Sequence, residues 1–159
     1  MFNVGDKVVY PMHGAGIIEA IEEREVLGRR ATYYVMRLPI SEMQVMVPCE
    51  HSRNTGLRQV TSEQALQGVL EVLRARKSAM VKNWNHRYRA NMEKIKSGNI
   101  LDLAEVVRNL SQRDREKGLS TGERKMLDSA RQILLSEIIL AKNVELDQAN
   151  EFLDQVLVQ

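Results

Sequence analysis

The sequence predicts an α+β protein, with a small antiparallel β domain in residues 1–60 and a bundle of about five helices in residues 61–159. Before residue 60, short runs of β-branched and aromatic residues alternate with turn residues. After it, apolar residues recur every three to four positions, as on one face of a helix. The chain has 159 residues, of which 43% are hydrophobic and 28% charged. This composition is typical of a globular protein, and the length allows a sizeable core in one domain or two small ones.

Four strands are expected in the first sixty residues. They are the segments 6–10, 15–25, 31–38 and 43–47. Pro11 ends the first strand, the Leu27-Gly28 pair breaks the second, and Pro48 follows the fourth. The third strand is the clearest, because it is rich in β-branched and aromatic residues. Short strands with turns at this spacing suggest a strongly bent antiparallel sheet or barrel.

Five helices are expected in the rest of the chain, each preceded by a polar residue suited to the N-cap position. These residues are Thr61, Asn83, Asn99, Ser120 and Asn143. The first and fourth of them have a Gln or Glu three residues later, which is the pattern of a capping box. Glycines at positions 98 and 118 are expected to end the second and third helices.

The sequence offers little chemistry for catalysis. The three histidines, at positions 13, 51 and 86, fall on separate predicted elements. Cys49 and His51 would supply only two of the four ligands of a structural zinc site. The chain has no glycine-rich phosphate loop ending in Lys-Ser/Thr and no Gly-x-Ser-x-Gly elbow. We therefore expect a non-catalytic protein with no metal, no other cofactor and no small-molecule substrate.

The cellular location is expected to be the cytoplasm. A single cysteine, Cys49, rules out a disulfide framework and is consistent with a reducing compartment. The sequence has no run of about 18 apolar residues, so we expect no association with a membrane. The first ten residues, MFNVGDKVVY, have neither the basic nor the apolar region of a secretion signal.

Charge is distributed unevenly, although the formal net charge is only +2. Residues 1–60 contain seven basic and seven acidic residues. Residues 74–97 contain eight basic residues and one acidic residue, whereas residues 143–159 contain four acidic residues and no basic one. The basic segment is either a phosphate-binding surface or a solvated helix face.

Trp84, the only tryptophan, lies inside this basic segment at the expected start of the second helix. It is four residues before Tyr88, so the two rings share a helix face. Two interpretations remain open. Trp84 is a core anchor, which the local pattern slightly favours, or it is an exposed ring that stacks on an unpaired base or wedges into a base step. Tyr88 is expected to face the core.

Two further basic residues, Arg124 and Lys125, begin the fourth predicted helix. Cations at a helix N-terminus oppose the helix dipole, whereas the N-terminus itself attracts phosphate. The combination is more typical of an anion site than of a stabilising device.

Two sets of motifs together span essentially the whole chain. The opening motif is Phe2-x-Val4-Gly5-Asp6-x-Val8-Val9-Tyr10-Pro11-x-His13-Gly14. The helical motifs are Asn83-Trp84-x-x-Arg87-Tyr88 and Gly118-Leu119-Ser120-x-Gly122-Glu123-x-x-Met126-Leu127-x-x-Ala130-Arg131-x-Ile133-Leu134. Both sets resemble the motifs of the CarD/CdnL bacterial transcription regulators. The opening motif is shared with the polymerase-interacting domain of transcription-repair coupling factors, whereas the helical motifs are more specific.

The resemblance implies a Tudor-like β domain that docks on the RNA polymerase β subunit. The docking contacts would be Arg24 and the strand before Pro48, which carries Met46 where some members have a basic residue. The resemblance also implies a helical domain that contacts promoter DNA weakly, with little sequence preference. There Trp84 would wedge into the minor groove at the upstream edge of the melted bubble and stabilise the open complex.

The resemblance further implies that Arg87, Arg89 and Arg124 approach the DNA backbone, and Lys125 beside Arg124 is expected to contact DNA as well. Two other functions stay open at this point. In one, the chain is a polymerase-binding adaptor whose basic segment 74–97 meets an acidic protein surface. In the other, it binds DNA tightly on its own as a nucleoid protein.

Overall fold

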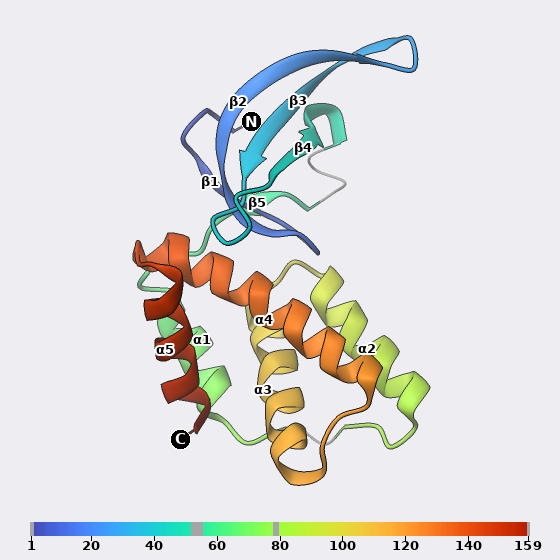
Figure 1. The fold of residues 1–159 in the computed structure, drawn as a ribbon, viewed down its shortest axis with the longest axis vertical. Coiled ribbons are helices and arrows are strands. Elements are labelled where there is room, and N and C mark those ends of the chain that lie inside the picture. The colour runs from blue at the N-terminus through green and yellow to red at the C-terminus, as the bar shows by residue number, and fades with distance from the viewer. Residues whose placement is uncertain (1, 52–55, 78–79, 159) are drawn as a thin grey trace.

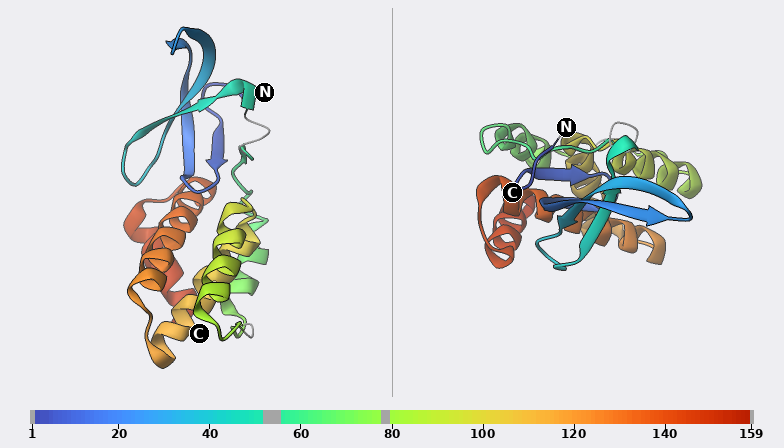
Figure 2. Two further views of the ribbon diagram at one scale, coloured as in Figure 1. Left: turned by 90° about the vertical axis from the view of Figure 1, so that its right-hand side faces the viewer. Right: turned by 90° about the horizontal axis from the view of Figure 1, so that it is seen from above.

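A computed structural model describes residues 2–51, 56–77 and 80–158 of the chain. It contains an antiparallel sheet of five strands in the N-terminal part and five helices in the C-terminal part, which confirms the predicted α+β fold. Figure 1 shows the sheet stacked on one end of the helical bundle, so that the molecule is elongated. The side view in Figure 2 shows the same stacking.

The sheet has the strand order β4-β3-β2-β1-β5. The strands are β1 (Lys7–Tyr10), β2 (Gly14–Val26), β3 (Arg29–Arg37), β4 (Gln44–Pro48) and β5 (Arg58–Gln59). The four predicted strands match β1 to β4, and a short 3₁₀ turn over Cys49–His51 follows β4. The register between β2 and β3 shifts between Ile18 and Ala20, and such a bulge bends a strand. Figure 1 shows the long, curved β2–β3 hairpin that results.

A small apolar cluster holds the sheet together. Its largest fully buried side chains are Val8, Ile18, Tyr34, Met36 and Val47. They come from β1, β2, β3 and β4, so each of these strands contributes to one core. The strand β4 lies at an edge of the sheet and leaves its outer side unpaired among the described strands.

The helical bundle forms the larger core. Its helices are α1 (Leu66–Arg74), α2 (Trp84–Lys96), α3 (Ile100–Lys117), α4 (Thr121–Lys142) and α5 (Leu146–Val158). Leu110 of α3, Leu134 and Leu135 of α4 and Leu153 of α5 have no exposed surface. Val9 and Ala15 of the sheet belong to this helical cluster, so the core continues across the junction of the two parts.

Three of the five predicted N-caps are confirmed. The side chains of Asn83 and Asn99 and the hydroxyl of Ser120 accept hydrogen bonds from backbone N–H groups in the first turns of α2, α3 and α4. The other two are wrong. Helix α1 begins at Leu66, without a side-chain cap, rather than at Thr61. Asn143 has a left-handed φ of 56° and ends α4 instead of starting α5.

The junction of sheet and helices is held by polar contacts that are mostly shielded from water. Arg58 of β5 forms two hydrogen bonds of 2.8 Å with the carboxylate of Glu137, which lies on α4 and is completely buried. The Ala15 N–H donates to the hydroxyl of Ser136, and the Lys7 ammonium group donates to the Leu140 carbonyl. Strands β1, β2 and β5 are therefore all bonded to the same stretch of α4.

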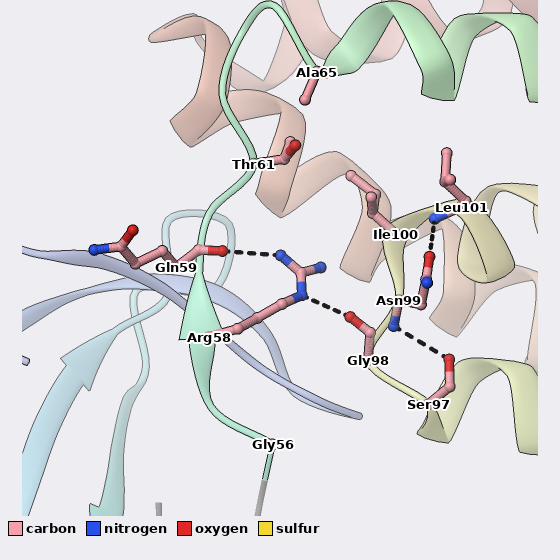
Figure 3. Close-up of a pocket in the computed structure, with 10 residues that line it drawn as sticks. All are labelled: Gly56, Arg58, Gln59, Thr61, Ala65, Ser97, Gly98, Asn99, Ile100 and Leu101. Atoms are coloured by element: carbon pink, nitrogen blue, oxygen red, sulfur yellow. Dashed lines mark hydrogen bonds between the residues drawn. The ribbon is translucent and has the colours of Figure 1, made fainter. Parts of the chain in front are cut away.

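A hollow of about 500 Å³ lies beside this junction (Figure 3). Arg58 reaches across it and donates from Nε to the Gly98 carbonyl, just before α3. The Asn99 side chain beside it accepts from the Leu101 N–H. Because the polar groups drawn there bond to one another, we interpret this hollow as part of the junction.

We expect Arg58→Met to lower the free energy of unfolding by about 3 kcal/mol, because it leaves the buried Glu137 carboxylate without its counter-charge. Urea unfolding followed by circular dichroism measures this. Arg30→Met, at an exposed position of β3, is the matched control and is expected to change stability by less than about 0.5 kcal/mol. Equal effects of the two changes would contradict a stabilising role for the pair.

Candidate nucleic-acid interface

Trp84 is partly exposed and held in one orientation. Its side chain is 41% exposed, and its ring stacks on Tyr88 with 5.1 Å between centroids and 20° between planes. The indole N–H donates to the Ser120 hydroxyl over 3.0 Å. Gly122 leaves room for the ring, since a Cβ there would lie 3.2 Å from Cζ2 of Trp84. Trp84 therefore lies outside the buried core, whereas Tyr88 packs against it.

Ser120 combines two tasks. Its hydroxyl accepts from the Glu123 N–H, as a helix cap does, and donates to a carboxylate oxygen of Glu123. The hydroxyl oxygen of Ser120 also accepts from the indole N–H of Trp84. The start of α4 therefore fixes both its own first turn and the ring on α2. The sequence pattern Ser-x-x-Glu revealed the cap but gave no signal for the bond to Trp84.

A buried ion pair lies next to this cap. Arg87 is 5% exposed and donates two hydrogen bonds, of 2.8 and 3.1 Å, to the carboxylate of Glu123, which is 2% exposed. The guanidinium also donates to the backbone carbonyls of Val81 and Lys82. This pair ties α2, α4 and the segment before α2 to one another.

The hydrogen bonds from Arg87 hold the pKa of the Glu123 carboxyl below its usual value, although burial acts in the opposite direction. The same bonds raise the pKa of Arg87. Both groups are therefore charged at neutral pH. The sequence did not reveal this partnership, because the two residues are 36 positions apart.

Arg87 is one of the residues expected to approach the DNA backbone, and in this structure its guanidinium is buried and engaged with Glu123 and two carbonyls. The other three cations are placed differently. Arg89 on α2 and Arg124 and Lys125 in the first turn of α4 are all exposed. Arg124 forms an exposed ion pair of 2.8 Å with Asp114. Since the starts of α2 and α4 meet at Trp84, these side chains belong to the same end of the bundle.

The two residues expected to face polymerase lie on the sheet. Arg24 of β2 is exposed and pairs with Glu22 over 2.8 Å. Met46 is 38% exposed on the edge strand β4, and the nearby Met43 is 61% exposed. Figure 1 shows the sheet and the start of α2 at opposite ends of the long axis. The predicted site residues therefore fall into two separate groups in the structure.

Among the residues that the structure describes, no group of three or more His, Cys, Asp or Glu side chains could hold a metal ion. Cys49 is half-buried, and desolvation raises the pKa of its thiol. No helix in the described part of the chain combines the length and apolarity needed to cross a membrane.

Comparisons with known proteins match both parts of the chain. Residues 2–61 match the family model "CarD-like/TRCF RID domain", and residues 68–154 match "CarD, C-terminal domain". A Bacillus subtilis (strain 168) protein named "Putative transcription factor YdeB" is 44% identical over 152 residues, which cover 96% of this chain and 99% of that protein. The solution structure of the 72-residue N-terminal domain of Myxococcus xanthus CarD is 37% identical, covers 37% of this chain and 79% of that one, and has a TM-score of 0.33.

Proposed function

We propose, since this chain belongs to the CarD family of transcription regulators, that it binds RNA polymerase through its sheet and stabilises the open promoter complex with Trp84. The observation that carries the proposal is the indole itself. It is partly exposed, fixed by Ser120 and Tyr88, and lies in a segment of the sequence that contains eight basic residues. An aromatic ring presented in this way can insert at a base step that is already unstacked.

The proposed mechanism needs no chemical step. A protein that binds the open promoter more tightly than the closed one shifts the equilibrium by the difference in affinity. A preference of about 1.4 kcal/mol changes the ratio tenfold. The upstream edge of the melted bubble offers unstacked steps, whereas intact duplex must be deformed before a wedge can enter. A rigidly held ring loses little conformational freedom on insertion, so the Arg87–Glu123 pair would favour binding through preorganisation.

In this proposal, Arg89, Arg124 and Lys125 contact backbone phosphates beside the ring. The positive ends of the dipoles of α2 and α4 add to this attraction, because α2 begins at Trp84 and α4 begins directly after Ser120. Arg87 positions the ring instead of contacting DNA. Such binding is expected to be weak and to fall with salt, with a slope of about −3 in log K against log [salt] for three phosphate contacts.

The sheet would supply the tether, on the β subunit of polymerase. An edge strand with exposed apolar side chains can accept a strand or an apolar surface from a partner, and β4 with Met46 has this character. Arg24 would add a charged contact. Tethering raises the local concentration of the helical end at the promoter, so weak DNA affinity is enough.

We expect Met46→Glu to weaken binding to purified polymerase by about tenfold, because a charge would enter an apolar contact. Fluorescence anisotropy of the labelled protein measures this affinity. Val158→Glu makes the same change at an exposed position of α5, in the other part of the molecule, and is expected to leave the affinity unchanged. If both variants bind like the wild type, Met46 is not at the docking surface.

The experiment that tests the function as a whole is promoter melting by purified polymerase, with and without the protein. A fluorescent base in the melted region reports the fraction of open promoter over time. The proposal expects a larger open fraction and slower closing when the protein is present. An unchanged closing rate at saturating protein would overturn it.

A further inference from the structure

A basic hollow lies beside the Arg87–Glu123 pair. Its volume is about 560 Å³, and it lies next to the segment that leads into α2. The residues that line it are Lys77, Met80, Val81, Lys82, Arg87, Arg113 and Lys117. Five of these seven side chains are cationic, and none is acidic.

Only part of this charge is compensated. Lys77 pairs with Glu116, and Arg87 pairs with Glu123. Within the described ranges, no ion pair links Lys82, Arg113 or Lys117 to a carboxylate. The five cations around the hollow are therefore balanced by only two carboxylates, those of Glu116 and Glu123, which leaves three positive charges in excess. Like charges held this close repel one another, and a bound anion would relieve that repulsion.

One nitrogen of the Arg113 side chain lacks a hydrogen-bond acceptor among the described residues. Its Nε is sealed from solvent and has no hydrogen-bond partner. Buried arginine nitrogens almost always have an acceptor, because the group loses its hydration when it is covered. Arg113 is one of the residues that line the hollow, so an anion bound there would lie beside this side chain.

We propose that this hollow binds a phosphate-bearing anion that carries at least two negative charges. Guanidinium groups bind phosphate oxygens in pairs, and ammonium groups add charge without geometric demands. The phosphate has two possible sources, which are a free oligophosphate and the DNA backbone. Lys82 is two residues before Trp84, so a strand that passes the ring could also reach the hollow. The free-anion source is independent of the proposed function, whereas the DNA source rests on it.

Calorimetric titration of the intact protein with inorganic pyrophosphate tests the site without polymerase or DNA. The wild type is expected to show saturable binding to one site. Arg113→Gln and Lys117→Gln are each expected to weaken it by at least about tenfold, since each removes a cation from the hollow. Arg115→Gln, on the same helix but exposed and outside the lining, is the matched control and is expected to bind within about twofold of the wild type.

Competition then identifies the source. If a forked DNA duplex displaces pyrophosphate, the site takes a backbone phosphate, and if both bind at once, it takes a free oligophosphate. Trp84→Ala should bind pyrophosphate normally, so failure of the wedge and failure of this site can be told apart. Absence of saturable binding to a wild-type protein that is folded by circular dichroism would overturn the proposal. Equal losses in the variants at positions 113 and 115 would overturn it as well.

Discussion

Replacing Trp84 with Ala is expected to shorten the lifetime of the open promoter complex by about fivefold or more, while the protein stays folded. A base stacked on an aromatic ring contributes about 1–3 kcal/mol, which corresponds to roughly 5- to 150-fold in lifetime. The ring is 41% exposed and lies outside the buried core, so its loss should cost little stability. The lifetime is measured with purified polymerase after a competitor traps enzyme that dissociates.

The control for this experiment is Leu101→Ala, which removes another exposed apolar side chain, 43% exposed, from the start of α3. It is expected to leave the open-complex lifetime unchanged. A thermal melt of each variant accompanies the kinetics. If Trp84→Ala unfolds the protein, the ring is a structural anchor, and if the folded variant supports a normal lifetime, the ring is not a wedge.

The second large effect concerns stability. Arg87→Met is expected to lower the free energy of unfolding by about 3–5 kcal/mol, because it leaves the Glu123 carboxylate buried without a partner. Arg131→Met is the matched control. Arg131 pairs with Asp154, whose side chain is 65% exposed, so this loss should cost less than about 1 kcal/mol. The double change Arg87→Met with Glu123→Leu should recover much of the stability, because no uncompensated charge remains.

The pH dependence of this pair has a defined sign. The folded-state pKa of Glu123 is lowered, so the carboxylate adds stability above its unfolded-state pKa, near 4.5, and loses it as the pH falls through the folded-state pKa. Urea unfolding of the wild type and of Arg87→Met between pH 7 and pH 3 measures this. We expect the difference between the two to shrink at the acid end. A constant difference over the whole range would contradict the assigned role of the ion pair.

Features with a local origin could be predicted from the sequence. The strands β1 to β4 are bounded by proline and glycine, and the caps at Asn83, Asn99 and Ser120 bond to N–H groups two or three residues away. The exposure of Trp84 could not be predicted from the residues next to it in the sequence. Only the resemblance of the motifs around it to the CarD/CdnL family favoured exposure over burial.

Features that depend on distant partners could not be predicted. Thr61 does not cap α1, which begins only at Leu66, and the Thr61 N–H is bonded to Glu137, 76 residues away. Arg87 is one of eight basic residues in the segment 74–97, and nothing in that pattern sets it apart. Its burial follows from α2 and α4 starting side by side, which brings it to Glu123. A pair of residues as short as β5 carries no periodicity to detect.

The measurement that tests the central claim most directly is site-specific photocrosslinking from position 84, in a polymerase–promoter complex that contains the intact protein. A photoreactive phenylalanine replaces Trp84, and the same group at position 101 is the control. The account predicts crosslinks from position 84 to promoter DNA at the upstream edge of the melted bubble, and none from position 101. Crosslinks from position 84 to a protein partner, with no DNA product, would contradict it and favour an adaptor instead.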